Sequence, residues 1–456
     1  MKSIREEEYK ALVEQAKDAH EKYNIFETII EDYNTNEGPL KGVPYVLKDN
    51  ISTSNILTTA SSNILKDYIP VYDASIYERL KKSGAVLLGK STMDELAMGG
   101  LGITGHLGPV KNPLDPKRIM GGSSSGSAAA VALGLVPFAI GSDTGDSIRK
   151  PAAYGGIVGF KPSYGRIPRY GLFAFASSLD HLGFFTKNVS DAAYLTTLLK
   201  GPDGFDMTAL EDDKLDYCQS LNDDIKNKNL FYFKDLVDPK NYQDEEAKLI
   251  LESFNKKIAE FKEAGLKIEG IDFDRALLEA IKPSYMIISS AEATSNNANL
   301  TGIIFGTRAK GDDIDEIITN SRTEGFSTAI KKRFVQGSYF LLKDNQEKIF
   351  KKAQKARRMI VDAINSEFLK YDALIMPSTA TIAPLFSELD EQKDELVILE
   401  NYLAIANFGG YPSISIPSDK INSMPIGISL TGRFKEDALV LNIANKLEEL
   451  LGDKDV

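Results

Sequence analysis

The sequence is poor in cysteine and histidine, and these shortages limit the chemistry that is open to it. Its 456 residues include one cysteine, Cys218, and three histidines, His20, His106 and His181. A single cysteine excludes an intrachain disulfide framework and a cysteine-based zinc site. A serine nucleophile that needs imidazole as its base has few candidates in this chain.

Positive charge and long apolar runs are also scarce. Lys and Arg total 54 against 65 Asp and Glu, a formal net charge of −11. This balance argues against a broad nucleic-acid surface, so we expect a partner to hold any RNA. The longest apolar segment, 128–140, is interrupted by Gly134 and Pro137 and falls short of the ~18 residues of a membrane span. The charged N-terminus lacks the apolar core of a signal peptide, and we expect a cytoplasmic protein.

Short apolar strands and amphipathic helices alternate at both ends of the chain, which is typical of an α/β protein. The pattern predicts strands at 42–47, 85–89, 229–233, 372–378, 413–417 and 425–432. It predicts helices at 5–22, 75–82, 127–135, 190–199 with Ser190 as N-cap, 244–264, 345–369 and 435–450. No linker or internal repeat divides the chain. We expect one domain over residues 1–456, with a sheet core at about 24–202 and 371–456 and a mostly helical excursion at about 203–370.

Residues 121–152 hold two glycine- and serine-rich turns around a segment of small apolar residues. Glycines let backbone amides approach a ligand or another chain segment, and alanines let a helix pack tightly beside them. Ordinary turns that flank a buried helix are one interpretation. Two such loops so close together favour the other, a functional site.

Two nucleotide-binding motifs fit only in part. Residues 100–105 have the glycine spacing of a dinucleotide-binding loop, but a helical stretch separates them from the preceding strand. Residues 121–126 have the spacing of a phosphate-binding loop, but Ser127 and Ala128 stand where that loop has its lysine and its hydroxyl residue. Neither segment therefore predicts a nucleotide site.

A nucleophile elbow also matches residues 122–126, with Ser124 at its centre. That motif requires a preceding strand, and residues 110–120 are not expected to form one. His181 would be its only base in chain order. Because His181 lies beside Asp180, a structural or solvated role fits this histidine better.

A lysine made neutral by burial is the remaining candidate base. Lys48 ends the apolar run VPYVL, where desolvation would favour the neutral amine. Its pKa would have to fall from ~10.4 by roughly three units, or about 4 kcal/mol. The residues alone leave a second interpretation open, a surface lysine that pairs with Asp49.

Three segments together resemble the amidase signature family: the strand that ends at Lys48, GGSSSGSAAA at 121–130 and GSDTGDSIRKPA at 141–152. The resemblance implies an α/β fold in which helices cover both faces of a central mixed β-sheet, with a helical insertion. It also implies amide hydrolysis by a Ser-cisSer-Lys triad. By motif position, Ser147 would be the nucleophile, Ser123 the bridging serine and Lys48 the base.

The same resemblance implies an oxyanion hole built by the backbone amides of Thr144, Gly145, Asp146 and Ser147. Two residues depart from the family pattern, because Ser125 and Asp146 replace glycines. A carboxylate at Asp146 would oppose the developing negative charge unless it points away or is paired. It could also force a backbone angle that glycine adopts freely.

Within this family, segments 84–99 and 161–193 are similar to the glutamine-hydrolysing subunits of the tRNA-dependent amidotransferases, as is the run of motifs in 321–339. The resemblance implies glutamine as substrate, with Arg333 on its α-carboxylate and Glu400 on its α-amino group. A surface salt bridge is the alternative role for each of these two residues.

The resemblance further implies partner subunits B and C. It places ATP, Mg and tRNA at a partner, with no cofactor or metal in this chain. The ammonia would convert Glu-tRNA(Gln) or Asp-tRNA(Asn) to the amidated form. The segment before Lys48 is shorter than is usual in these subunits, which could alter how partners dock. Two alternatives stay open, a free-standing amidase for other small amides and a scaffold subunit in which Asp146 has disabled the oxyanion hole.

Overall fold

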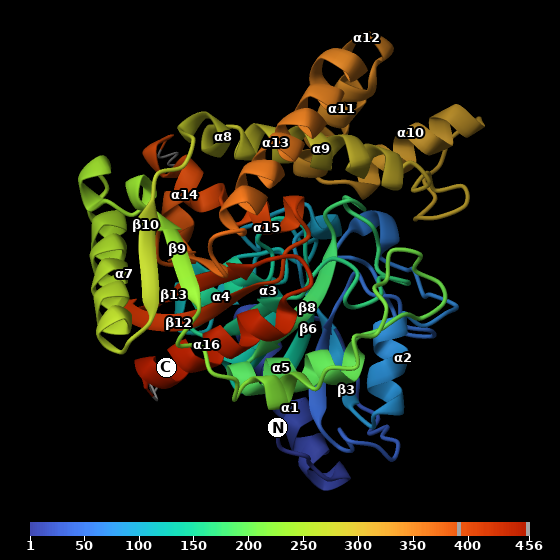
Figure 1. Ribbon diagram of the computed structural model, residues 1–456. Coiled ribbons are helices and arrows are strands. Elements are labelled where there is room, and N and C mark those ends of the chain that lie inside the picture. Colours follow the sequence, from blue (N-terminus) through green and yellow to red (C-terminus); the bar gives the residue numbers. More distant parts are fainter. Residues whose placement is uncertain (390–393, 453–456) are drawn as a thin grey trace.

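A mixed β-sheet of 11 strands runs through the molecule (Figure 1). We describe it from a computed structural model, which covers residues 1–389 and 394–452. The strands lie in the order β1-β3-β2-β6-β8-β7-β12-β13-β11-β9-β10. Their bounds are β1 Phe26–Ile29, β2 Pro44–Lys48, β3 Val86–Ser91, β6 Phe138–Asp143, β7 Val158–Lys161, β8 His181–Thr186, β9 Asn229–Phe233, β10 Lys267–Ile271, β11 Ala373–Pro377, β12 Ser413–Ile421 and β13 Met424–Gly432.

Strands from the two ends of the chain meet in the middle of this sheet, where β7 pairs antiparallel with β12. On one side of this junction, β2 runs parallel to both β3 and β6. The carboxyl ends of β2 and β6 therefore lie at the same edge of the sheet. Lys48 ends the first of these strands and Asp143 ends the second.

Helices cover both faces of the sheet. The main ones are α1 Glu6–Tyr23, α2 Ser75–Lys82, α3 Ser125–Ala132, α4 Arg149–Gly155, α5 Val189–Leu199, α7 Glu245–Glu263, α9 Ile281–Asn296, α10 Ile314–Gly325, α11 Thr328–Leu341, α13 Lys351–Glu367 and α16 Asp437–Leu451. Shorter ones are α6 Tyr217–Ser220, α8 Arg275–Glu279, α12 Lys343–Asn345, α14 Val397–Asn401 and α15 Ala404–Phe408. Among the residues described, no helix combines the length and the apolar character that crossing a membrane requires.

The core has two parts because successive strand residues point to opposite faces of the sheet. Val46 of β2 packs with the buried residues of α1 and α3, whereas Tyr45 and Leu47 pack in a larger cluster with α5 and α16. All five residues of β2 are buried. The predicted fold class, a central mixed sheet flanked by helices, is confirmed.

Three local predictions need correction. Helix α5 is capped by Asn188, whose side chain accepts a hydrogen bond from Asp191 N, so Ser190 lies inside the helix. The helix predicted for 345–369 is divided, since a π-helical turn at Gln346–Phe350 separates α12 from α13. Residues 110–120 do form strands, β4 Lys111–Asn112 and β5 Asp115–Ile119, in a separate small hairpin. The expectation of no strand there was wrong, because the hairpin is partly exposed and lacks an apolar pattern.

Residues 203–370 contribute both strands and helices. Strand β9 pairs parallel with β11 and with β10. Strands β9 and β10 therefore extend the sheet beyond β11 at one edge. Helices α8 to α13 gather at one end of the molecule, above the sheet in Figure 1. The division into one domain with a helical excursion stays a prediction.

Candidate active site

Lys48 lies inside the protein at the carboxyl end of β2. Its side chain is 0% exposed, so the surface interpretation is wrong. Its Nζ lies 2.7 Å from Ser123 Oγ and 2.9 Å from Ser142 Oγ. Burial lowers the pKa of Lys48 to about 7, although nearby acids such as Asp94 oppose that shift. A substantial fraction of this amine is therefore neutral near pH 7 and able to accept a proton.

Asp49 does not pair with Lys48. Its carboxylate accepts hydrogen bonds from the backbone and hydroxyl of Thr59, at 2.7 and 2.6 Å, and lies 3.4 Å from Lys90 Nζ. Lys90 is itself fully buried. Lys48 and Lys90 are thus both buried on adjacent strands, and of these two it is Lys48 that contacts the serine-rich loop.

Ser123 lies in the first Gly/Ser-rich loop, two residues before α3 begins at Ser125. The Gly122–Ser123 peptide bond is cis. The Ser123 carbonyl accepts a hydrogen bond from Asp94 N at 3.1 Å. The side chain of Ser124, the centre of the elbow motif, donates to the Ser142 carbonyl at 3.0 Å. Ser123 is therefore the serine of this loop that meets Lys48.

Ser147 lies in the second loop, between β6 and α4, and is 4% exposed. Its carbonyl accepts a hydrogen bond from Ser124 N at 3.3 Å, which holds the two loops together. The backbone N–H groups of residues 144–147 donate no hydrogen bond to any other residue in the described part of the chain. Consecutive free amides beside a buried hydroxyl can hold a negatively charged oxygen.

A buried ion pair that the sequence patterns did not reveal fixes the second loop. Arg149 Nη2 lies 3.0 Å from Asp143 Oδ1 and donates to the Gly145 carbonyl at 2.8 Å. Both side chains are 0% exposed. Although burial alone would raise the pKa of Asp143, the Arg149 guanidinium holds it well below its usual range. Asn407 completes the network, because its amide accepts from Arg149 at 2.8 Å and donates to Asp143 at 2.9 Å.

Asp94 organises the glycine-rich segment 100–105. Its carboxylate accepts hydrogen bonds from the amides of Gly102, Ile103 and Thr104 at 2.9 to 3.1 Å. A Cβ at Gly122 would come within 2.1 Å of this carboxylate. The GxGxxG spacing therefore serves a turn that packs against the Ser123 loop, and no helix opens after it.

Asp180 and His181 also have structural partners. Asp180 accepts hydrogen bonds from Thr144 Oγ1 at 2.7 Å and from Phe175 N at 3.0 Å, so it ties the second loop to the segment before β8. His181 Nδ1 lies 2.6 Å from the Leu179 carbonyl. In residues 1–389 and 394–452, no serine hydroxyl hydrogen-bonds to His181.

Asp146 is paired, and its backbone is unstrained. Its Oδ2 lies 2.5 Å from Lys150 Nζ. Asp146 is not among the residues with positive φ, so the position does not require glycine. Ser125, the other departure, is the first residue of α3 and also has a negative φ.

Arg333 belongs to α11 and contacts α9. It donates a hydrogen bond to Ser289 Oγ at 3.2 Å, and its guanidinium lies 5.2 Å from the centre of the Phe175 ring. Tyr285 of α9 packs against the second loop, because a Cβ at Gly145 would lie 2.9 Å from its ring. No acidic side chain of the described residues forms an ion pair with Arg333.

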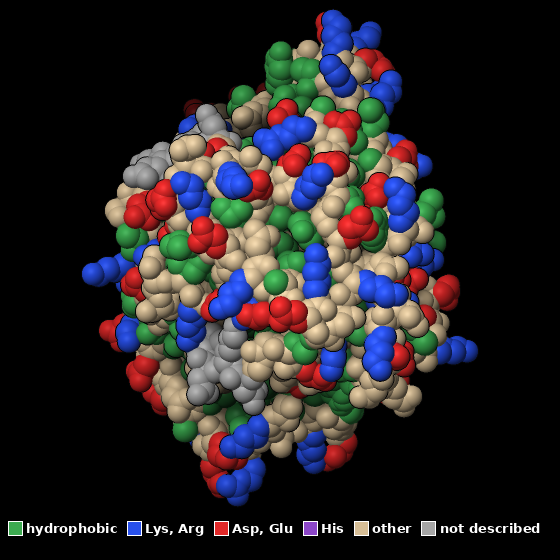
Figure 2. Space-filling model, turned by 60° about the vertical axis from the view of Figure 1, so that its left-hand side comes forward, with side chains coloured by type: hydrophobic (Ala, Val, Ile, Leu, Met, Phe, Trp, Pro, Cys, Tyr) green, Lys and Arg blue, Asp and Glu red, His purple; other side chains and the backbone are tan. Residues whose placement is uncertain are grey.

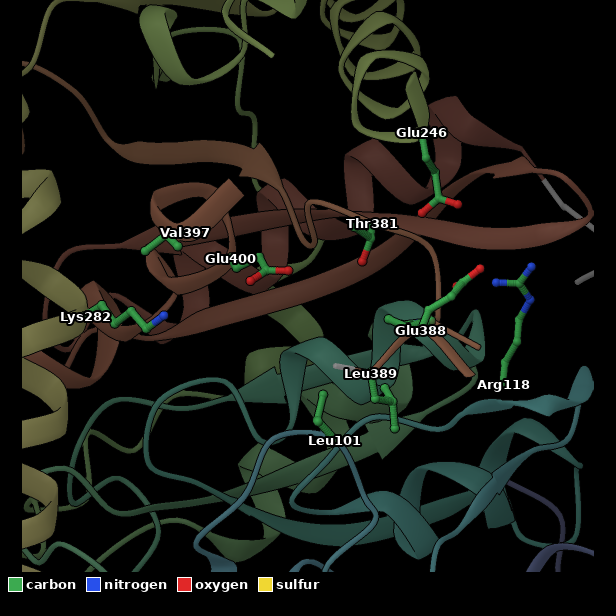
Figure 3. A pocket seen from close by; sticks show the side chains of 10 residues that line it. Leu101, Arg118, Glu246, Lys282, Thr381, Glu388, Leu389, Val397 and Glu400 are labelled. Carbon is green, nitrogen blue, oxygen red and sulfur yellow. The ribbon is translucent and has the colours of Figure 1, made fainter. Parts of the chain in front are cut away.

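Glu400 lies in a pocket of about 320 Å³ (Figure 3). Charged side chains share this pocket, and in Figure 3 Lys282 points toward Glu400 from one side. The ten lining residues are Leu101, Arg118, Glu246, Lys282, Thr381, Pro384, Glu388, Leu389, Val397 and Glu400. Glu400 also acts on Lys150, since its charge contributes to raising the pKa of that lysine. Arg333 and Glu400 therefore approach the second loop from different elements.

One face of the molecule (Figure 2) carries side chains of both charges, in keeping with the mixed charge composition of the sequence. On the face shown in Figure 2, acidic and basic side chains lie interspersed. Within the described ranges, no three His, Cys, Asp or Glu side chains gather in a group that could hold a metal ion.

Known proteins with similar sequences and structures support one family. The Amidase family model matches residues 4–441. The A subunit of glutamyl-tRNA(Gln) amidotransferase from Sulfolobus acidocaldarius is 38% identical over 432 residues, which cover 94% of this chain and 89% of that protein. Its counterpart from Carboxydothermus hydrogenoformans is 40% identical over 419 residues, which cover 90% and 84%.

A crystal structure agrees with these matches. The A subunit of glutamyl-tRNA(Gln) amidotransferase from Thermotoga maritima is 32% identical and superposes with a TM-score of 0.80, covering 98% of this chain and 92% of that one. The family model, the sequence relatives and the crystal structure thus all match almost the whole chain. This chain belongs to the amidase family.

Proposed function

We propose that this chain is the glutaminase subunit of a tRNA-dependent amidotransferase, with Lys48, Ser123 and Ser147 as its catalytic residues. The observation that carries the proposal is the 2.7 Å contact between Lys48 Nζ and Ser123 Oγ, beside a loop with four free amides. A buried lysine with a pKa of about 7 is a suitable base here, since no histidine of the described residues hydrogen-bonds to Ser123 or Ser147.

In the proposed mechanism, neutral Lys48 takes a proton from Ser123, which takes the proton of Ser147. The Ser147 oxygen bonds to the side-chain amide carbon of glutamine, and the amides of Thr144, Gly145, Asp146 and Ser147 hold the resulting oxyanion. The proton returns along the same path to the nitrogen as the C–N bond breaks, releasing ammonia. Water then cleaves the glutamyl ester and restores Ser147.

Arg333 and Glu400 hold the two charged ends of glutamine in this proposal. Arg333 carries a positive charge with no acidic partner among the described residues, which suits the α-carboxylate. Glu400 projects into the neighbouring pocket and suits the α-amino group.

Subunits B and C would complete the enzyme in the cytoplasm. A partner would bind ATP, Mg and tRNA and use the ammonia to amidate Glu-tRNA(Gln) or Asp-tRNA(Asn). The net charge of −11 supports this division, because tRNA binding needs clustered positive charge.

Ammonia release from glutamine by the assembled complex tests the catalytic assignment. We expect Lys48→Ala and Ser147→Ala to lower kcat by at least ~10³-fold, because each removes a group that the chemical step needs. His181→Ala is the control and should keep most of the activity. Loss of activity in His181→Ala, with retention in Lys48→Ala, would contradict the lysine mechanism.

Two further outcomes separate the alternatives. Robust turnover of other amides by the chain without partners would indicate a free-standing amidase. A complex that amidates tRNA with free ammonia but not with glutamine would indicate a scaffold subunit. Assaying both mischarged tRNAs in the same series identifies which one is served.

A further inference from the structure

The residue directly before the proposed nucleophile forms an ion pair across the start of α4. Asp146 Oδ2 and Lys150 Nζ are 2.5 Å apart, and Lys150 N donates to the Asp146 carbonyl at 2.9 Å. Both side chains are largely buried, with 21% of Asp146 and 16% of Lys150 exposed. An ion pair with so little solvent around it is weakly screened, so each charge strongly affects its neighbours.

Other charges near Asp146 are already engaged. Arg149 is occupied by Asp143, Gly145 and Asn407. Asp143 of β6 and Glu400 of α14 add negative charge, and Tyr285 of α9 and Tyr154 of α4 are neutral phenols. Lys48 of β2, whose pKa the Asp146 charge raises, is engaged by Ser123. In the described part of the chain, Lys150 is the one cation that forms an ion pair with Asp146.

An unpaired carboxylate here would oppose the proposed chemistry. The Asp146 amide is one of the free N–H donors proposed to hold the oxyanion, and Asp146 directly precedes Ser147 in the sequence. Like charges a few ångströms apart in a partly buried site repel strongly. Burial raises the pKa of the Asp146 carboxyl, and the Lys150 ammonium partly offsets that rise.

We propose that Lys150 is a positioning residue for catalysis, which neutralises Asp146 so that the nucleophile loop carries no uncompensated negative charge beside Ser147. Lys150 touches no reacting atom and acts through Asp146. The Asp146–Lys150 pair carries no net charge, and neither does the glycine that the family pattern has in place of Asp146. This inference rests on the proposed amide hydrolysis.

The test compares Lys150→Met with the double variant Asp146→Gly/Lys150→Met in the glutaminase assay of the assembled complex. We expect Lys150→Met to lower kcat by ~30-fold with little change in KM, because the repulsion arises mainly as the oxyanion forms. The double variant should return to within about threefold of the wild type. Lys82→Met is the matched control, since Lys82 forms an exposed i,i+4 pair with Glu78 on α2.

The pH dependence separates this effect from a structural one. In Lys150→Met, the ratio of its kcat to that of the wild type should change with pH, because the unpaired Asp146 carboxyl becomes negative as pH rises and this charge raises the pKa of Lys48. The ratio should be independent of pH in the double variant. Lys150→Gln, which keeps a polar side chain, serves if Lys150→Met does not fold.

Four results decide the outcome. A ratio of Lys150→Met kcat to wild-type kcat that does not change with pH would overturn the role of Lys150. Wild-type kcat in both Lys150→Met and Lys150→Gln would do the same. A double variant as impaired as Lys150→Met would overturn it as well. A wild-type complex that releases no ammonia from glutamine would instead refute the proposed function.

Discussion

Among single residues, Lys48 couples activity to stability. Burial lowers its pKa to about 7, whereas a lysine in the unfolded chain titrates near ~10.4. Between these values the unfolded chain binds a proton that the folded chain has released. The free energy of unfolding therefore rises with pH in this window, and the folded state is penalised at pH 7 and below.

We predict that Lys48→Met raises the free energy of unfolding at pH 6 by about 1–3 kcal/mol while it abolishes activity. Removing the buried cation stabilises the folded state by more free energy than is lost with the hydrogen bonds to Ser123 and Ser142. Urea unfolding at pH 6 and at pH 9 measures this change, and the gain should shrink at the higher pH. A gain that is equal at both pH values would contradict the assigned pKa of Lys48.

The wild-type activity should depend on the protonation of Lys48 as well. Because neutral Lys48 is the proposed base, kcat/KM should rise with pH around a midpoint near 7. The measurement is a pH profile of ammonia release. A flat profile from pH 5.5 to 8.5 would show that no group with this pKa controls the reaction.

Among the structural elements, the connection from β6 to α4 depends on the Asp143–Arg149 pair. Both side chains are fully buried, and Arg149 also binds the carbonyls of Gly145 and Leu403. A buried pair of this kind contributes little net stability as a whole, but the loss of one partner leaves an uncompensated charge.

We predict that Arg149→Met lowers the free energy of unfolding by about 3–5 kcal/mol. Arg358→Met is the control and should cost less than about 1 kcal/mol, because its i,i+4 pair with Asp362 is exposed. Urea unfolding of both variants gives the comparison. Equal costs would mean that the buried network does not hold the nucleophile loop.

Across the molecule as a whole, the sheet joins segments that are far apart in the sequence. Strand β9, from the middle of the chain, pairs with β11, and β12 near the C-terminus pairs with β7. Elements that share one hydrogen-bonded sheet and one large apolar cluster are expected to unfold together.

Native-state hydrogen exchange tests this expectation. We predict that the amides of β9 and β11 exchange through openings with the same free energy, within about 1 kcal/mol. The small β4–β5 hairpin, which is separate from the main sheet, should open more easily. If β9 and β10 exchange well before β11, residues 203–370 form a separate unit, and the single-domain prediction fails.

Most of the elements and the candidate residues could be predicted without the fold. Periodicity predicted most strands and helices, because burial on one face imposes a repeat of two or about 3.6 residues. The glycine and serine motifs identified the two loops, and the lack of histidine made Lys48 a candidate base, but the roles of Lys48, Ser123 and Ser147 came from the family resemblance. These signals are local, so they can be read directly from the order of the residues.

Which charges are buried, and which of them meet, depends on the folded arrangement. Lys48 and Asp49 are neighbours in sequence, yet one contacts Ser123 and the other Thr59 and Lys90. The Arg149 network uses Asn407, which lies 258 residues away, and Asp146 forms an ion pair with Lys150 across one helical turn. A residue's pKa and partners depend on desolvation and on contacts between distant segments, and neither property exists until the sheet has brought those segments together.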